Sequence, residues 1–316
     1  MRLLSTTDPL PHQPPAGSNI SNSSSRSNDV NVEDTEDVID FGFKTVPRQQ
    51  KEALVGQVFS NVASSYDIMN DLMSGGLHRL WKHRLVETLA PFAGMQHLDV
   101  AGGTGDVAFR VLRAIQTAEQ IDRQLPQQPQ QWQAHQAQQQ AGQQQQEQHQ
   151  QQQGAVTVFD INAEMLEVGK QRARARGLTT GLSWVQGNAE QLPFPDACMD
   201  SYTVAFGIRN VTDRHAALCE AHRVLRRGGR LLCLEFSQVS LPLLRQVYDA
   251  YSFNVIPKIG GLVAHDEASY QYLVESIRQF PDQESWADQI RDAGFRAVTH
   301  ENLTGGVVAI HSGFKL

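Results

Sequence analysis

The feature that most constrains the fold of this 316-residue chain is a glycine-rich turn between a short strand-like segment and a helical one. Residues 97–100 have the composition of a short buried strand, and the apolar side chains of residues 107–115 recur at helical spacing. Gly103-Thr104-Gly105 lies directly between them. Because glycine has no Cβ, such a turn lets the backbone approach a ligand closely. The sequence therefore predicts a ligand site where a strand passes into a helix.

Strands and helices alternate along the rest of the chain. We expect further strands at 155–159, 182–185, 201–205, 230–236, 295–299 and 307–311, and helices within 50–90 and at 163–176, 216–225 and 286–293. Gly228 and Gly229 are expected to end the helix at 216–225. This order predicts an α/β, Rossmann-like fold with a mostly parallel seven-stranded sheet and helices on both faces. Its ligands should bind beyond the carboxyl ends of the strands.

A glutamine-rich tract interrupts this alternation. Residues 124–153 are almost entirely glutamine, so we expect a disordered insertion at about 116–153. Asp160 follows Gly103 by 57 residues, and removing the 38 residues 116–153 leaves 19. That is the spacing of a ribose-binding acid at the end of the second strand, in NAD and S-adenosylmethionine (SAM) enzymes alike. Taken singly, Asp160 also fits a helix cap, and the glycines fit an ordinary tight turn.

The loop after the third strand favours SAM. Residues 187–196 read GNAEQLPFPD, typical of the turn that packs beside the adenine in SAM-dependent methyltransferases. A dehydrogenase has no use for this turn. Residues 224–232 also resemble the helix-to-strand turn after the fourth strand of class I methyltransferases. We therefore expect a class I SAM-dependent methyltransferase fold, with helices preceding it at the N-terminus.

Charge, cysteine content and hydropathy argue against several other classes of protein. The net charge of −7 argues against a nucleic-acid partner, because phosphate binding needs a concentrated basic face. The basic residues of 170–176 are interpreted as a solvated helix face. Three scattered cysteines predict neither a disulfide framework nor a metal site, so no metal is expected. The sequence has no apolar run long enough to span a membrane, so we expect any membrane contact to be peripheral.

The sequence divides into two regions. Residues 1–40 are poor in apolar side chains, and we expect a disordered tail or a transit peptide there. Arg2 and Arg26 among many serines match a transit peptide only moderately. Residues 41–316, with the glutamine-rich insertion, are expected to form one SAM-dependent methyltransferase domain.

Two further stretches resemble signature segments of the ubiquinone/menaquinone C-methyltransferase family. They are residues 66–82, YDIMNDLMSGGLHRLWK, and residues 206–213, FGIRNVTD. The likeness runs from about Thr45 to the C-terminus, and the lead-in at 41–46 favours the mitochondrial, ubiquinone branch. The resemblance implies C-methylation of a 2-methoxy-6-polyprenyl-1,4-benzoquinol to its 5-methyl derivative. It also implies a peripheral place on the matrix side of the mitochondrial inner membrane, a multi-subunit quinone-biosynthesis complex and a possible homodimer.

The resemblance also assigns cofactor residues. Thr104, Asp160 and the Asn188-Ala189 pair match positions that contact SAM in the family, and Gly103 and Gly105 complete the expected cofactor site. A serine of bacterial members is replaced by Ala205, so no contact is expected from that side chain.

The chemistry of the acceptor defines the expected catalytic residues. A ring carbon is a poor nucleophile until a ring hydroxyl loses its proton, so the site must take up that proton or stabilise the phenolate. Arg209 stays protonated and suits stabilisation, Asp67 or a water that it holds suits the base, and Tyr66 suits orientation of the ring or of the water. Packing and capping of the N-terminal helices would explain Tyr66 and Asp67 equally well. His78 and His83 are expected to make surface or helix–helix contacts.

Other interpretations stay open. The apolar residues of 241–262 fit a cap over a prenyl tail, an interfacial helix, a dimer interface or ordinary core. A plastid or menaquinone-type naphthoquinol methyltransferase is the nearest alternative function. A non-catalytic subunit that binds quinol or SAM is a further one.

Overall fold

The computed structural model describes residues 37–62, 70, 71, 74–124, 153–239, 246, 251, 258 and 267–316. Residues 37–316 belong to one compact unit. The expected tail or transit peptide lies outside the described residues, apart from 37–40, and so does the core of the glutamine tract. Both interpretations stay predictions.

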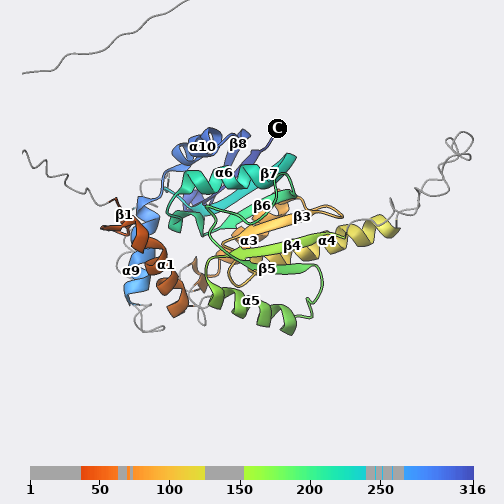
Figure 1. Ribbon diagram of the computed structural model, residues 1–316, viewed down its shortest axis with the longest axis horizontal. Helices are drawn as coiled ribbons and strands as arrows, with labels where there is room; N and C mark the ends of the chain where they lie inside the picture. Colours follow the sequence, from red (N-terminus) through yellow and green to blue (C-terminus); the bar gives the residue numbers. More distant parts are fainter. Residues whose placement is uncertain are drawn as a thin grey trace, which may run out of the picture. The chain divides into compact units, whose positions relative to one another are not determined.

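A seven-stranded sheet organises the unit (Figure 1). Its strands are β3 (Gln96–Val100), β4 (Ala155–Asp160), β5 (Leu182–Gln186), β6 (Met199–Ala205), β7 (Leu225–Phe236), β8 (Arg296–Leu303) and β9 (Val308–Phe314). Their spatial order is β5-β4-β3-β6-β7-β9-β8. Neighbours from β5 to β7 are parallel, whereas β9 is antiparallel to both β7 and β8. The expected mostly parallel sheet of seven strands is confirmed.

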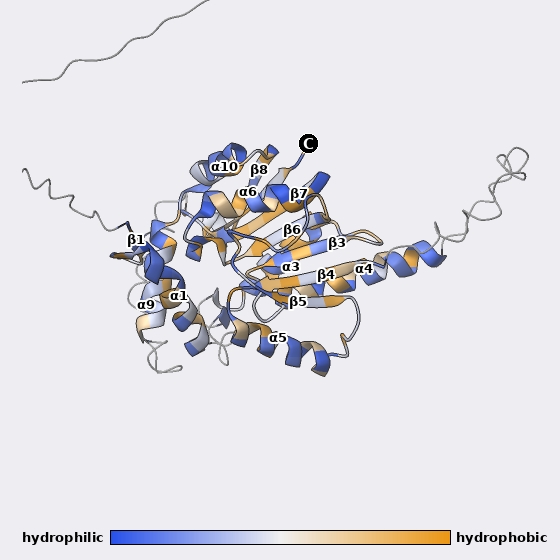
Figure 2. Ribbon diagram, in the orientation of Figure 1, coloured by the Kyte–Doolittle hydropathy of each residue, from blue (hydrophilic) through white to orange (hydrophobic). Residues whose placement is uncertain are grey.

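Helices cover both faces of the sheet (Figures 1 and 2). They are α1 (Arg48–Val62), α3 (His78–Leu89), α4 (Asp106–Gln124), α5 (Ala163–Ala175), α6 (Arg214–Val224), α9 (Glu267–Gln279) and α10 (Gln283–Asp292). One apolar core includes Leu85 of α3 and Leu112 of α4, and a second includes Leu218 of α6 and Trp286 of α10. Each of these four side chains is at most 2% exposed. Burial on this scale contributes about 25 cal/mol per Å² of apolar surface.

Helix α4 is longer than the sequence analysis predicted. It continues from Ile115 to Gln124, so the first part of the expected insertion at 116–153 belongs to a helix. Glu119 explains the extension, because its Oε1 accepts a hydrogen bond of 2.7 Å from the backbone N–H of Gly154. This contact ties the helix to the beginning of β4 and gives its last turns a tertiary partner.

The boundary between α6 and β7 also differs. The helix ends at Val224, and Leu225 is already extended and paired with Met199 of β6. The prediction that Gly228 and Gly229 end the helix is wrong. Gly228, with φ +82°, instead turns within β7 and donates its N–H to the carbonyl of Lys315.

A two-stranded hairpin and one helix were not predicted. A hairpin of β1 (Val38–Phe41) and β2 (Lys44–Pro47) precedes α1, and α9 precedes α10. Phe41 of the hairpin stacks on Tyr272 of α9 with the ring centroids 4.2 Å apart.

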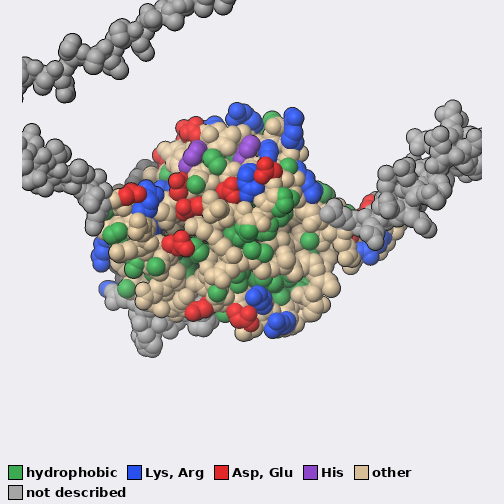
Figure 3. All heavy atoms as spheres, in the orientation of Figure 1, with side chains coloured by type: hydrophobic (Ala, Val, Ile, Leu, Met, Phe, Trp, Pro, Cys, Tyr) green, Lys and Arg blue, Asp and Glu red, His purple; other side chains and the backbone are tan. Residues whose placement is uncertain are grey.

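On the face drawn in Figure 3, acidic and basic side chains are interspersed over the surface of residues 37–316.

The ends of the glutamine tract lead to a prediction. Both flanks lie at the rim formed by the amino ends of the strands, since Ala155 pairs with Gln96 at the beginning of β3. Five helical residues, about 7.5 Å, separate Glu119, which binds Gly154, from Gln124. Replacing residues 125–152 by about eight Gly/Ser residues should keep the fold and SAM affinity within twofold, because the long loop itself contributes little. Loss of SAM binding by a folded variant, measured by calorimetry and circular dichroism, would contradict this.

Candidate active site

A pocket opens at the carboxyl ends of the parallel strands. Its wall is made by the turns after β3, β4, β5 and β6, together with residues of α1 and Lys82 of α3. This is the location expected of a ligand site in an open α/β sheet. Of the predicted site residues, Gly103, Thr104, Asp160, Asn188 and Ala189 line the pocket.

The predicted site residues outside this set fall into two groups. Gly105 and Arg209 are not part of the pocket wall. Tyr66 and Asp67 are outside the described residues, so their roles stay predictions.

The glycine-rich turn is built by close contacts. A Cβ on Gly102 would lie 2.7 Å from Cγ1 of Val158 in β4 and 2.9 Å from the carbonyl oxygen of Asp99. Gly103 has φ +49°, and its N–H points at the carboxylate of Asp160. Gly105 has φ +82°, and its missing side chain leaves room for the rings of Phe109 and Trp184. The first two glycines thus shape the pocket, whereas Gly105 serves packing behind it.

Asp160 presents a fixed, buried carboxylate. It is 8% exposed, and its oxygens accept 2.8 Å hydrogen bonds from the backbone N–H groups of Gly103 and Asn162. Burial raises its pKa to about 6, against the effect of these two donors. The group is therefore mainly ionised at neutral pH. A carboxylate has about four acceptor positions, so it retains capacity for two ligand hydroxyls.

The loop after β5 is held by hydrogen bonds on both sides. Asn188 donates through Nδ2 to Glu52 of α1 at 3.1 Å and accepts through Oδ1 from the N–H of Glu190 at 2.9 Å. Glu190 in turn accepts from the N–H groups of Thr212 and Asp213. The turns after β5 and β6 and helix α1 therefore form one connected wall.

Asp99 is a pocket residue that the sequence analysis missed. It is 1% exposed and accepts hydrogen bonds from the hydroxyl of Thr203 at 2.7 Å and the N–H of Ala108 at 3.1 Å. Burial raises its pKa to about 7. An acidic residue in a buried strand, just before the glycine turn, is the signal that could have identified it.

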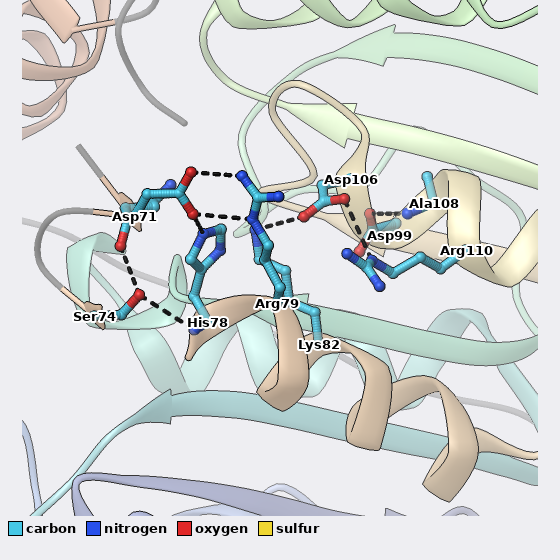
Figure 4. Close-up of polar contacts among 10 residues, drawn as sticks. Asp71, Ser74, His78, Arg79, Lys82, Asp99, Asp106, Ala108 and Arg110 are labelled. Atoms are coloured by element: carbon cyan, nitrogen blue, oxygen red, sulfur yellow. Dashed lines mark hydrogen bonds and ion pairs between the residues drawn. The ribbon is translucent and has the colours of Figure 1, made fainter. Parts of the chain in front are cut away.

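A second missed feature is the ion pair of Lys82 and Asp106, whose Nζ and Oδ2 are 3.0 Å apart (Figure 4). Both residues line the pocket beside the glycine turn. Burial alone would raise the pKa of Asp106, but the charges of Lys82 and Arg110 bring it to about 2. The pocket wall therefore carries one fixed positive and one fixed negative charge side by side.

Arg209 is held in a buried ion pair. Its side chain is 4% exposed, and its Nη1 lies 3.0 Å from Oε1 of Glu235, whose side chain is 1% exposed. Nη1 also donates to the carbonyl of Phe206. Phe206 lines the pocket with φ +59°, a strained conformation for a residue other than glycine. Arg209 was expected to face the methyl acceptor and stabilise its phenolate. The guanidinium is instead directed at Glu235 and at the pocket loop, so this placement favours a role in positioning the loop.

Asn210, the neighbour of Arg209, does line the pocket. Its Oδ1 accepts a 3.0 Å hydrogen bond from the hydroxyl of Tyr272 in α9. This leaves its Nδ2 as a donor, and the sequence analysis did not single it out.

The expected histidine contacts are seen. His78 is 5% exposed and bonds Asp71 at 2.8 Å, and the exposed His83 pairs with Glu87 at 3.1 Å.

Within the described ranges, no group of three or more His, Cys, Asp or Glu side chains is placed to hold a metal ion. None of the helices that are described there is long and apolar enough to cross a membrane.

Comparison with solved structures supports the fold. A SAM-dependent methyltransferase from Aquifex aeolicus superposes with a TM-score of 0.50 at 13% identity, covering 79% of this chain and 98% of that one. A SAM-dependent methyltransferase from Thermotoga maritima gives a TM-score of 0.50 at 18% identity, with 82% and 99% covered.

Comparison with sequences is more specific. The 2-methoxy-6-polyprenyl-1,4-benzoquinol methylase, mitochondrial, of Oryza sativa subsp. japonica is 58% identical over 278 residues, covering 87% of this chain and 88% of that protein. Its Homo sapiens counterpart is 55% identical over 276 residues, covering 87% and 84%. The model of the ubiE/COQ5 methyltransferase family matches residues 45–315. The chain therefore belongs to the ubiE/COQ5 methyltransferase family.

Proposed function

We propose that the chain transfers a methyl group from SAM to a ring carbon of 2-methoxy-6-polyprenyl-1,4-benzoquinol, forming the 5-methyl derivative in ubiquinone biosynthesis. The observation that carries the proposal is the ionised carboxylate of Asp160, fixed by the glycine turn in the pocket of a chain that matches this family over residues 45–315. The names of the relatives in Oryza sativa and Homo sapiens supply the substrate.

The pocket residues fit SAM. Asp160 retains two acceptor positions for the ribose hydroxyls, and the loop at Asn188 and Ala189 provides a wall for the adenine. Lys82 and Asp106 offer charges opposite to those of the carboxylate and ammonium at the methionine end. When bound, SAM supplies a methyl group that is already activated as a sulfonium. The remaining task of the protein is to position the acceptor about 3 Å away and to exclude water.

The acceptor side of the pocket is arranged by the loop after β6. The pair of Arg209 and Glu235 anchors this loop to β7, and the bond to Phe206 maintains its strained backbone. Asn210 then presents an amide donor to a ring oxygen of the quinol. In this scheme Arg209 supports phenolate formation by positioning Phe206 and Asn210, and Asp67 or a water that it holds takes the proton while Tyr66 orients the ring.

We also propose a peripheral location on the matrix side of the mitochondrial inner membrane, because the relatives are named mitochondrial and the proposed substrate carries a prenyl tail. Assembly into a quinone-biosynthesis complex or a homodimer belongs to the same proposal. The segment at 241–262, for which a cap, an interfacial helix, a dimer interface and ordinary core were all considered, lies almost entirely outside the described residues.

Mass spectrometry of quinone intermediates in cells that lack this protein tests the function. The 2-methoxy-6-polyprenyl-benzoquinol should accumulate, and the wild-type gene should clear it. Accumulation of a naphthoquinol would favour the alternative substrate. Absence of labelled-methyl transfer to quinol by purified protein would favour a binding subunit.

The first site prediction concerns Asp160. Asp160→Asn should weaken SAM binding by about 2 kcal/mol, roughly 30-fold, because the ribose hydroxyls lose a charged acceptor. In the wild type, SAM affinity should fall as the pH decreases through about 6, since protonation removes acceptor positions, and it should level off above that pH. Calorimetry over a range of pH measures both effects. Asp288→Asn is the matched control, because it removes an exposed carboxylate of α10 outside the pocket wall and should leave SAM affinity unchanged.

The second site prediction concerns Arg209. Arg209→Lys keeps the charge, but an ammonium group cannot bond both Glu235 and Phe206 as the planar guanidinium does. We therefore expect kcat to fall by about tenfold or more, while SAM affinity barely changes. Arg209→Ala should lower kcat by roughly 10²-fold, because the pocket loop is misplaced, and stability by about 3–5 kcal/mol, because Glu235 remains buried and unpaired. Glu235→Gln is the companion variant. If both conservative variants lowered the melting temperature but left kcat intact, the pair would be purely structural.

The third site prediction concerns Asp67. If its carboxylate is the base, Asp67→Asn should flatten the acidic limb of the pH–rate profile without changing the melting temperature. Retention of full turnover and of that limb would assign Asp67 to helix packing instead.

A further inference from the structure

Tyr272 of helix α9 lies behind the pocket wall and is hydrogen-bonded to it. Its hydroxyl donates a 3.0 Å hydrogen bond to Oδ1 of Asn210, which lines the pocket, whereas Tyr272 itself does not. The tyrosine is 7% exposed. Burial raises its pKa to about 12, so the hydroxyl stays protonated and remains a donor at neutral pH. An effect of this hydroxyl on a ligand of the pocket therefore passes through Asn210.

The hydroxyl decides which end of the Asn210 amide is available to the pocket. The terminal torsion of an asparagine side chain is broad and roughly two-fold, so its oxygen and nitrogen exchange places easily. A donor fixed beside the oxygen favours one of the two orientations. Within the described part of the chain, no group accepts a hydrogen bond from Nδ2 of Asn210. The nitrogen is therefore left as a donor for a ligand.

The orientation of this amide matters for methylation of a ring carbon. An N–H group directed at a ring oxygen stabilises the phenolate that makes the carbon nucleophilic. An amide oxygen in the same place would accept a hydrogen bond from the ring hydroxyl and stabilise the protonated, unreactive quinol. A reversed amide would thus oppose formation of the phenolate.

The hairpin of β1 and β2 holds the ring of Tyr272, and it lies beside α9 in Figure 1. Phe41 stacks on the tyrosine with the ring centroids 4.2 Å apart and 21° between the ring planes. The turn of the hairpin also fits α9 closely. The N–H of Phe43 donates to Oε2 of Glu275 at 2.9 Å, and a Cβ on Gly42 would lie only 2.3 Å from that oxygen. The hairpin therefore fixes the place from which the hydroxyl donates.

Helix α9 contacts the loop after β6 at a second point. Ser276, one turn after Tyr272, accepts a hydrogen bond of 3.4 Å from Nε of Arg209. Residues four apart lie on the same side of a helix. One face of α9 therefore holds both Arg209 and its neighbour Asn210.

We propose that Tyr272 is a positioning residue of the acceptor site, whose hydroxyl orients the amide of Asn210 so that Nδ2 donates to the ring oxygen that becomes a phenolate. This inference rests on the proposed function, because a phenolate forms only if the acceptor is a quinol. The hydroxyl of Tyr272 keeps its proton throughout. The amide of Asn210 donates a hydrogen bond without transferring a proton, and the ring proton passes to the base.

The variant Tyr272→Phe tests this assignment, because it keeps the ring that stacks on Phe41 and removes only the hydroxyl. With saturating SAM and a short-tailed quinol in detergent, kcat should fall about fivefold, the factor that corresponds to one neutral hydrogen bond. The KM of the quinol should not rise, because the lost interaction stabilises the phenolate and not the bound quinol. Tyr202→Phe is the matched control, since it removes another buried tyrosine hydroxyl outside the pocket wall and should change kcat less than twofold.

A double variant separates an action through Asn210 from general packing. In an Asn210→Ala background, Tyr272→Phe should lower kcat by less than a further twofold, because the amide that the hydroxyl orients is gone. The same fivefold loss in both backgrounds would overturn the proposal. So would an unchanged kcat in the single variant.

A phenol probe reports the orientation of the amide without methyl transfer. The absorbance of 3-methoxy-4-nitrophenol changes on ionisation, so its pKa can be measured in the site beside S-adenosylhomocysteine. The wild type should hold this pKa below its value in water, and Tyr272→Phe should raise it by about 0.5–1. Equal pKa values in the two proteins would overturn the proposal. A lowered pKa in a wild type that transfers no methyl group to quinol would instead count against the proposed function.

Discussion

The hydrogen bond from the N–H of Gly103 to the carboxylate of Asp160 is the contact on which the pocket depends. It joins the carboxyl ends of β3 and β4, and it forms because Gly102 approaches Val158 more closely than a side chain would permit. The turn leaves the carboxylate ionised but desolvated, with acceptor positions directed at the pocket. A larger residue at position 102 would push the turn away from β4, and the acceptor would lose its fixed position.

Buried ion pairs complete the wall around this carboxylate. Burying a charge without a partner costs several kcal/mol. Lys82 is therefore matched by Asp106 and Arg209 by Glu235, whereas Asp160 is stabilised by backbone N–H groups. Lys82 and Asp106 fix the beginning of α4, and Arg209 with Glu235 fixes the loop after β6. A buried ion pair adds little net stability compared with apolar side chains of similar volume. We therefore infer that these two pairs serve to position the pocket loops.

Much of the candidate site was predictable because its residues lie at fixed places in a repeating pattern. Gly103, Thr104, Asp160, Asn188 and Ala189 each lie at or just after the end of a strand, and parallel strands end at one rim. Arg209 follows a strand too, but its direction depends on Glu235, 26 residues later on the neighbouring strand. No local pattern reveals such a partner. Asp99 was overlooked because a single acid in a short buried strand has no periodicity of its own.

The sequence by itself determined the strands of the large sheet, the glycine turn and the class of cofactor, because these depend on local spacing and backbone freedom. Only the tertiary structure decided that α4 continues to Gln124, since the contact of Glu119 with Gly154 crosses the glutamine tract. It also decided that Tyr272 of α9 meets Asn210 of the pocket wall. The direction of a side chain across a helix interface is set by how neighbouring helices pack. The local sequence around each residue does not reveal which distant residues it will meet.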